Sequence, residues 1–232
     1  MVRRGFCISL ALTGLVVSSA GAAPAQPLRP APARATSIAP RSVRSESLSF
    51  AEQTRLVAGD TVARPMVLTT GQGRYVGGLA YQVVRASPAE VLAALGNAAE
   101  LPLMLPRTKA ARLVDVTRRG ARVELTSGTS LVETTYTVVL KRATATEVRF
   151  RLDPSRPHGI RDLWGYVRVK PLGKGQTLVT MAVALDVGPG LVRALFEDKI
   201  QRVILDTPRR IRDYLEPKAL ARSDSPAAAP RM

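Results

Sequence analysis

The sequence predicts an α+β domain in which an antiparallel sheet packs against a long C-terminal helix. From Lys109 to Asp186, apolar residues alternate with polar ones, as they do in half-buried antiparallel strands. After Gly188, apolar residues recur at helical spacing as far as Leu215. Ahead of both segments, a strand-like hairpin leads into a well-marked helix start. These three observations favour mixed secondary structure within one domain.

A short helix and a hairpin are expected at the start of the domain. Ser49 can cap a helix that runs as far as Ala58. Residues 64–70 and 74–86 follow and are rich in Val, Leu, Tyr and Thr, which is typical of strands. The Gly-Gln-Gly sequence at 71–73 fits a tight turn, so we expect the two strands to pair antiparallel.

The strongest local signal in the chain is the start of a second helix. Ser87 can accept a hydrogen bond from the backbone of Glu90, and the Glu90 carboxylate can accept one in return. Pro88 suits the first helical position because its missing N–H would have no partner there. Residues 98–103 indicate another short helical turn after this helix.

The strands that follow, and the last helix, are separated by turn-forming residues. Gly-rich and Thr-rich clusters divide residues 109–186 at hairpin distances, so we expect a meander. The C-terminal helix should break at Thr207-Pro208, because threonine can cap and proline can start a new helix.

The segments outside the domain predict an exported protein. Arg3 and Arg4, an apolar run and the small residues at 20–23 are the three parts of a secretory signal peptide. We therefore expect a periplasmic or secreted protein, with an uncleaved N-terminal anchor as the alternative. The expected organisation is a signal peptide at 1–23, a disordered Pro/Ala-rich linker at 24–47, the folded domain at 48–217 and a disordered tail at 218–232.

The composition argues against several kinds of catalytic and metal-binding site. Cys7 is the only cysteine and lies in the expected signal peptide, so the mature chain would lack disulfides, thiolate metal sites and a cysteine nucleophile. His158 is the only histidine and lies in a Pro-rich loop, which disfavours a zinc site and a Ser-His-Asp triad. We therefore expect no catalytic residue, no metal and no cofactor.

The charge of the chain is strongly basic, with a formal net charge of +16. The arginines are spread along the sequence and aromatic residues make up only 4% of it, which argues against nucleic acid as the partner. A weak contact with an anionic membrane surface is compatible with this composition. A solvated arginine-rich surface is the simpler interpretation.

Two segments resemble a known family. Residues 82–95 followed by Leu-Pro-Leu-Met-Leu-Pro at 101–106 resemble the strand-to-helix signature of the START/Bet v 1/polyketide cyclase-like (SRPBCC) superfamily, which includes coenzyme Q-binding START-like domains. Residues 164–180 resemble its late hairpin, and Leu92 departs from a frequent tryptophan. The resemblance implies a helix-grip fold, in which a curved antiparallel sheet wraps around a long C-terminal helix, with two short helices near the N-terminal strand.

Members of this superfamily hold lipids, sterols, quinones or polyketides in a cavity between sheet and helix, so inward positions should line it. Core packing is the ordinary alternative for each candidate. Tyr136 is the strongest, because a buried hydroxyl needs a partner. Trp164 and Tyr166 alternate in phase with Arg168 and should face outward. The predicted ligand-binding residues are Tyr136, Phe150, Val179, Met181 and Val183 from strands and Phe196 and Ile200 from the helix.

The resemblance and the sparse chemical inventory favour an exported binding or transfer protein for a hydrophobic small molecule, such as a lipid, isoprenoid or polyketide-like compound. One alternative is an enzyme of the cyclase, aromatase or hydrolase type on the same fold. Another is a non-catalytic envelope scaffold that acts through its basic surface.

Overall fold

The computed structural model describes residues 47–71, 73–129 and 132–223, and its elements confirm the predicted α+β class. The expected signal peptide, and the expected linker as far as residue 46, lie outside the described residues. The elements are α1 (Phe50–Val57), β1 (Val62–Thr70), β2 (Gly73–Val84), α2 (Pro88–Gly96), the 3-10 helix η1 (Ala98–Glu100), α3 (Leu101–Met104), β3 (Thr108–Thr117), β4 (Gly120–Gly128), β5 (Glu133–Thr144), β6 (Glu147–Leu152), β7 (Asp162–Gly173), β8 (Gln176–Asp186), α4 (Leu191–Leu205) and α5 (Thr207–Ser223).

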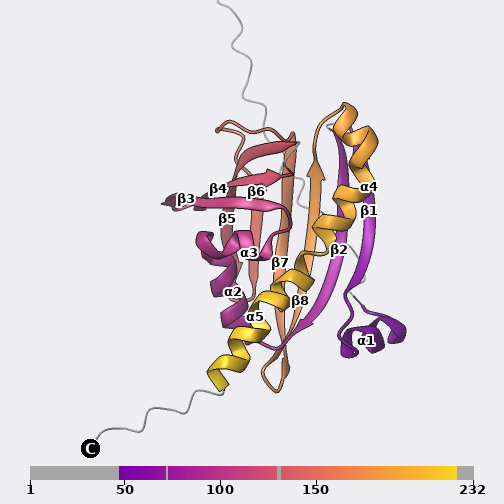
Figure 1. Cartoon of the computed structure of the whole chain (residues 1–232), viewed down its shortest axis with the longest axis vertical. Helices are drawn as coiled ribbons and strands as arrows, with labels where there is room; N and C mark the ends of the chain where they lie inside the picture. Colours follow the sequence, from indigo (N-terminus) through magenta and orange to yellow (C-terminus); the bar gives the residue numbers. More distant parts are fainter. Residues whose placement is uncertain (1–46, 72, 130–131, 224–232) are drawn as a thin grey trace, which may run out of the picture. The chain divides into compact units, whose positions relative to one another are not determined.

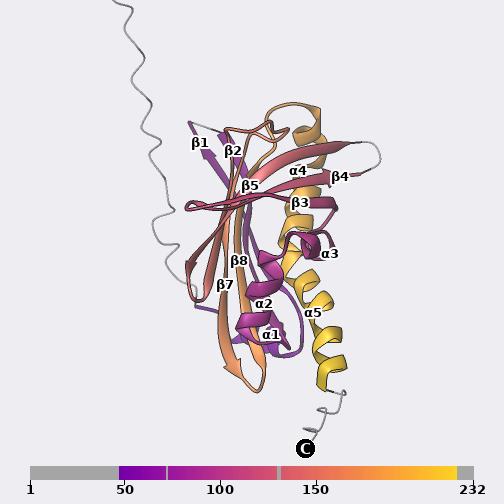
Figure 2. The same cartoon turned by 90° about the vertical axis from the view of Figure 1, so that its left-hand side faces the viewer.

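The strands form one antiparallel sheet in the order β1-β2-β8-β7-β6-β5-β4-β3. Strands β3 to β8 are the predicted meander, and the β1–β2 hairpin joins it through the β2–β8 pair. The sheet is curved, and Figures 1 and 2 show α2, α3, α4 and α5 on the same side of it. We call this side the concave face and the other side the convex face. The arrangement confirms the expected helix-grip fold.

Both predicted N-terminal caps are present as capping boxes. The Ser87 hydroxyl accepts a hydrogen bond from the Glu90 backbone at 3.3 Å, and the Glu90 carboxylate accepts one from the Ser87 backbone at 2.7 Å. Ser49 and Glu52 exchange the same pair of bonds at the start of α1. Each box satisfies backbone donors that the first helical turn leaves unpaired, which explains why sequence located both helix starts correctly.

The C-terminal helix breaks at Asp206, as the Thr-Pro pair predicted. The Thr207 hydroxyl donates to the carbonyl of Ile204 at 2.7 Å, and α5 begins at Thr207. However, α5 continues to Ser223, so the expectation of a disordered tail from Lys218 is wrong for residues 218–223. The Lys218 ammonium lies over the Tyr214 ring, which ties the extra turn to the helix before it. Residues 224–232 lie outside the described residues.

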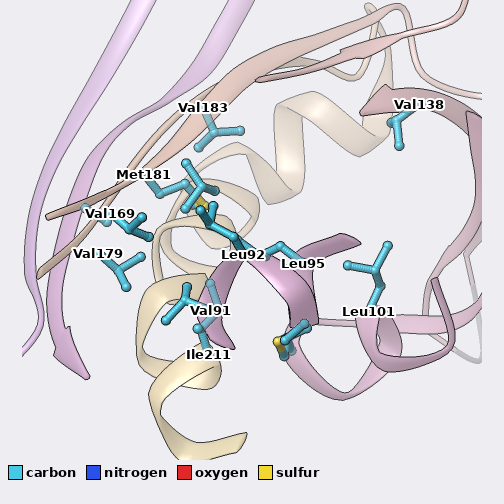
Figure 3. Close-up of a cluster of buried hydrophobic side chains, with 14 of the residues drawn as sticks. Val91, Leu92, Leu95, Leu101, Val138, Val169, Val179, Met181, Val183 and Ile211 are labelled. Atoms are coloured by element: carbon cyan, nitrogen blue, oxygen red, sulfur yellow. The ribbon is translucent and has the colours of Figure 1, made fainter. Parts of the chain in front are cut away.

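The main hydrophobic core lies between the concave face and helices α2, α3 and α5. In Figure 3, Leu92 and Leu95 of α2 point toward sheet residues, while Ile211 of α5 approaches Val91. Val91 and Ile211 are completely buried. Burial of apolar area of this kind contributes roughly 25 cal/mol per Å², so the helices are held on the sheet chiefly by this cluster.

A second, smaller core holds α1 to the convex face. Leu56 of α1 packs with Val62 of β1 and with Leu79 and Tyr81 of β2, and all four are buried. The Arg64 guanidinium donates two hydrogen bonds to the Glu52 carboxylate, at 2.8 Å and 2.6 Å. An apolar contact and a bidentate ion pair therefore fix this short helix to the hairpin.

Hydrogen bonds from Arg64 and from the Ser49 backbone lower the pKa of Glu52 from 4.5 to about 2. Because the pKa in the folded state lies below that of the unfolded chain, this pair stabilises the fold above the ordinary Glu pKa, and that contribution is lost as pH falls toward 2. In an NMR titration, Arg64→Gln should return the Glu52 pKa toward 4.5. A pKa that stays near 2 in the variant would contradict the assigned cause.

Candidate functional site

The sheet register brings the predicted strand residues to one face. Residues directly opposite each other in antiparallel strands point to the same side. Val183 of β8 pairs with Gly165 of β7, which pairs in turn with Phe150 of β6. The predicted residues of β5, β6 and β8 all belong to or pack against the concave-face cluster: Tyr136, Phe150, Val179, Met181 and Val183.

The three β8 residues lie in the closed part of this face. Val179, Met181 and Val183 are 0%, 4% and 8% exposed. Figure 3 shows their side chains pointing toward the residues of α2 and α5. In this conformation they pack as core residues, and direct contact with a ligand requires neighbouring side chains to move.

A second group of inward-facing residues is only half-buried. Leu140 of β5 pairs with Phe150 of β6, and Tyr136 and Val148 lie on the same face of these strands. All four pack against the core cluster and yet keep some contact with solvent. We call Tyr136, Leu140, Val148 and Phe150 the apolar strip. It is the accessible part of the predicted site.

Phe150 owes its position to a glycine on the neighbouring strand. A β-carbon placed on Gly165 would lie 2.5 Å from the Phe150 ring and 2.2 Å from the Ala182 carbonyl oxygen. Only a residue without a side chain allows the ring to lie this close to the backbone. The strip therefore depends on Gly165, a residue that was not among the predicted site residues.

A cluster of hydroxyl groups lies at one end of the apolar strip. The Tyr136 hydroxyl is 3.4 Å from the Ser127 hydroxyl, which is 3.2 Å from that of Thr108. Thr134 pairs with Ser127 across β4 and β5, and its hydroxyl oxygen is buried without a hydrogen-bond partner among the described residues. Such a group costs free energy unless a ligand or a water molecule satisfies it.

The electrostatic state of Tyr136 follows from its surroundings. Burial of the hydroxyl raises its pKa, and the hydrogen bond with Ser127 opposes this only in part. The hydroxyl therefore stays protonated near neutral pH. It can donate a hydrogen bond to a ligand oxygen but is unsuited to act as a general base.

The two helix residues predicted for the site lie elsewhere. Phe196 and Ile200 are on α4, which packs against β1, β2 and β8 rather than against the strip. Phe196 is 42% exposed and neither residue belongs to the concave-face cluster. Helical spacing correctly placed them in a helix, but it could not show which strands that helix would cover.

A pocket of about 470 Å³ lies away from the strip, between α1, the end of β2 and α5. Leu56, Val83 and Leu220 give it apolar walls, while Arg85 and Glu216 are among its polar residues. The sequence did not indicate this pocket, because its walls come from distant segments and Leu220 lies in the expected tail. None of the seven predicted residues lines it.

Three other groups with catalytic potential, those of His158, Asp153 and Tyr75, each have a partner within the protein. His158 is exposed, and its Nδ1 lies 2.7 Å from the Ile160 carbonyl oxygen. The Asp153 carboxylate accepts hydrogen bonds from Ser155 and Arg122, which lower its pKa against the opposing effect of burial. The Tyr75 hydroxyl donates to Asp162 at 2.8 Å, and burial followed by this bond raises the Tyr75 pKa to about 12.

The described residues offer neither a cluster of metal ligands nor a membrane-spanning helix. In the part of the chain that the structure describes, no group of three or more His, Cys, Asp or Glu side chains is placed to share a metal ion. Among the same residues, no helix has the length and apolar character that a membrane span requires.

Residues 80–216 match the sequence profile of a family described as polyketide cyclase / dehydrase and lipid transport. This match covers α2 and all of β3–β8, and so includes the apolar strip and the hydroxyl cluster. No curated protein sequence matches the chain.

Solved structures show the same fold at low sequence identity. The protein TTHA0849 of Thermus thermophilus is 16% identical, with a TM-score of 0.52 over 63% of this chain and 98% of that one. A STAR-related lipid transfer protein of Xanthomonas axonopodis is also 16% identical, with a TM-score of 0.52 over 66% and 93% of the two chains. The Zhui aromatase/cyclase of Streptomyces sp. R1128 is 12% identical, with a TM-score of 0.50 over 75% and 100%.

Proposed function

Because the chain belongs to the polyketide cyclase / dehydrase and lipid transport family, we propose that it is a non-catalytic carrier of a hydrophobic small molecule. The ligand would lie against the apolar strip of the concave face. Its class is an amphiphile with a long apolar body, such as a lipid, an isoprenoid or a polyketide-like compound.

The observation that carries this proposal is the junction of the strip with the hydroxyl cluster. Half-buried Phe150 and Leu140 offer apolar contact, and the Tyr136 hydroxyl lies at the end of that surface. The buried Thr134 hydroxyl lacks a partner among the described residues. An apolar wall with a few convergent polar groups is the usual design of a small-molecule site.

A carrier fits this chemistry better than an enzyme does. Tyr136 stays protonated, while Asp153 forms an ion pair with Arg122 and His158 lies on an exposed loop. These groups offer no activated nucleophile or base next to the strip.

A cyclase or aromatase is the second candidate, favoured by the protonated Tyr136 hydroxyl, which could hold a ligand carbonyl. The two functions differ in whether the bound compound is released unchanged. Mass spectrometry of a polyketide-like probe before and after incubation separates them, since only an enzyme would alter its mass or chromatographic behaviour.

We also propose that the carrier works outside the cytoplasm, close to an anionic membrane surface. The expected signal peptide and the basic composition support this location. Cell fractionation with N-terminal sequencing of the recovered protein tests it, and recovery of an intact N-terminus from the cytoplasm would overturn it. An envelope scaffold would show the same location without any ligand.

Ligand binding is tested most directly on the full chain purified under native conditions. Native mass spectrometry and organic extraction should reveal a co-purifying apolar compound. A protein that is consistently free of such a compound, and that also fails to bind the fluorescent fatty acid cis-parinaric acid, would refute the carrier.

Tyr136→Phe should weaken cis-parinaric acid binding about fivefold, because one hydrogen bond contributes about 1 kcal/mol. Fluorescence titration measures the dissociation constant. Tyr166→Phe is a matched control on the convex face and should leave the affinity unchanged. If the unaltered protein, Tyr136→Phe and Tyr166→Phe all bind cis-parinaric acid with equal affinity, the Tyr136 hydroxyl is not part of the site.

A further inference from the structure

The convex face of β5, β6 and β7 concentrates positive charge. Alternation along these strands places five cationic side chains on this face: Lys141, Arg149, Arg151, Arg168 and Lys170. Three acids share this face: Glu147, whose carboxylate accepts hydrogen bonds from Arg149 and Arg168, Glu133, which forms an ion pair with Lys109, and Asp162, which accepts a hydrogen bond from Tyr75. Burial opposes the ionisation of Glu147, but the guanidinium groups of Arg149 and Arg168 hold its pKa below the usual value. We call the five cations and their aromatic neighbours the convex basic face.

Three of the five cations have no partner within the described residues. Lys141, Arg151 and Lys170 are exposed, and no carboxylate lies within ion-pair distance of them in that part of the chain. Arg149 is 63% exposed even though it binds Glu147. The face therefore presents an excess of exposed positive charge to its surroundings.

The strand register makes this arrangement unfavourable for the sheet itself. Lys141 of β5 lies directly opposite Arg149 of β6. Like charges in directly opposed positions destabilise an antiparallel pair. Sheet stability therefore does not account for cations at these positions, whereas a negatively charged partner would relieve their repulsion.

Two aromatic side chains lie among the cations. Trp164 is directly opposite Arg151, and Tyr166 is directly opposite Arg149. Both rings are half-buried, and the Arg168 guanidinium lies 5.0 Å from the centre of the Tyr166 ring. Trp and Tyr combine an apolar ring with a polar group, which suits the boundary between water and lipid head groups.

We propose that the convex basic face binds the surface of an anionic lipid bilayer. The cations lie on the convex side of a curved sheet. A flat surface such as a bilayer can contact the side chains that lie along one line of that curve. A single nucleic-acid strand is usually held in a groove that follows its backbone, which this face does not provide. Clustered Lys and Arg next to interfacial aromatic rings match anionic head groups in charge and in polarity.

The test measures binding of the full chain to vesicles. Vesicles of phosphatidylcholine with about 30% phosphatidylglycerol should bind the protein at about 0.1 M NaCl, and raised salt should release it. The triple variant Lys141→Gln, Arg151→Gln, Lys170→Gln should bind about 100-fold more weakly, since each cation near such a surface contributes about a factor of five.

A second triple variant controls for total charge. Arg118→Gln, Arg119→Gln, Lys199→Gln removes the same charge from exposed positions on the β3–β4 turn and on α4. It should bind only slightly more weakly than the unaltered protein. Equal losses in the two triple variants would overturn the proposal, because bulk charge alone would then explain binding.

Trp164 is the only tryptophan of the chain and reports on this face directly. Brominated phosphatidylcholine in the anionic vesicles should quench its fluorescence in the unaltered protein but not in the first triple variant. Unquenched Trp164 in vesicle-bound protein would overturn the proposal, and so would preferential binding of a single-stranded oligonucleotide by this face. Vesicle binding by a protein that carries no co-purifying apolar compound and does not bind cis-parinaric acid would refute the carrier function alone, so the two proposals fail separately.

Discussion

Replacing Ile211 with alanine is expected to lower the free energy of unfolding by about 4 kcal/mol, near the upper end of the range for such changes. The Ile211 side chain is 0% exposed and belongs to the cluster that joins α5 to the concave face. Neighbours from both α2 and the sheet surround it, so the cavity left by the shorter side chain cannot close easily. Urea denaturation followed by circular dichroism measures the change.

Leu195→Ala serves as the matched control. Leu195 lies in α4 and is 68% exposed, so its truncation should change stability by about 0.5 kcal/mol or less. A loss below about 1 kcal/mol for Ile211→Ala would mean that α5 is not held to the sheet as described.

Gly165→Ala is expected to lower the free energy of unfolding by about 3 kcal/mol, because the new methyl group overlaps both neighbours. It would meet the Phe150 ring at 2.5 Å and the Ala182 carbonyl oxygen at 2.2 Å. The ring can turn away at some cost, but the backbone oxygen belongs to a β-ladder and has little freedom. The same denaturation experiment applies.

Two comparisons isolate this overlap. A β-carbon on Gly96 would meet no heavy atom within 4 Å, so Gly96→Ala should be close to neutral. Phe150→Leu in the Gly165→Ala background should recover part of the loss, because one of the two contacts is then relieved. Full additivity of the two substitutions would show that the ring and the glycine are not in contact.

Local chemistry allowed much of the fold to be predicted from sequence. The capping boxes at Ser49 and Ser87 need only residues within one helical turn, and both form as expected. The break before Pro208 and the alternating strands are also set by short-range geometry. Alternation further predicted that Trp164 and Tyr166 face away from the core, and the register agrees.

Contacts between segments that are distant in the sequence were harder to predict. The last turns of α5 depend on contacts such as that of Lys218 with Glu100, which no local pattern reveals. Periodicity showed that Phe196 and Val179 belong to apolar faces, but only the packed structure shows that one is exposed and the other buried. Close approach at Gly165 depends on the neighbouring strands, so sequence could not identify its role.

The strand order has a consequence for the synthesis of the chain. Every ladder except β2–β8 joins strands that are consecutive in sequence. The β2–β8 ladder instead pairs Val76 with Leu185, and Val84 with Thr177. The entropic penalty of closing such a long loop falls on this one ladder. Because β8 is the last strand to leave the ribosome, the N-terminal hairpin must wait for nearly the whole domain before its partner exists.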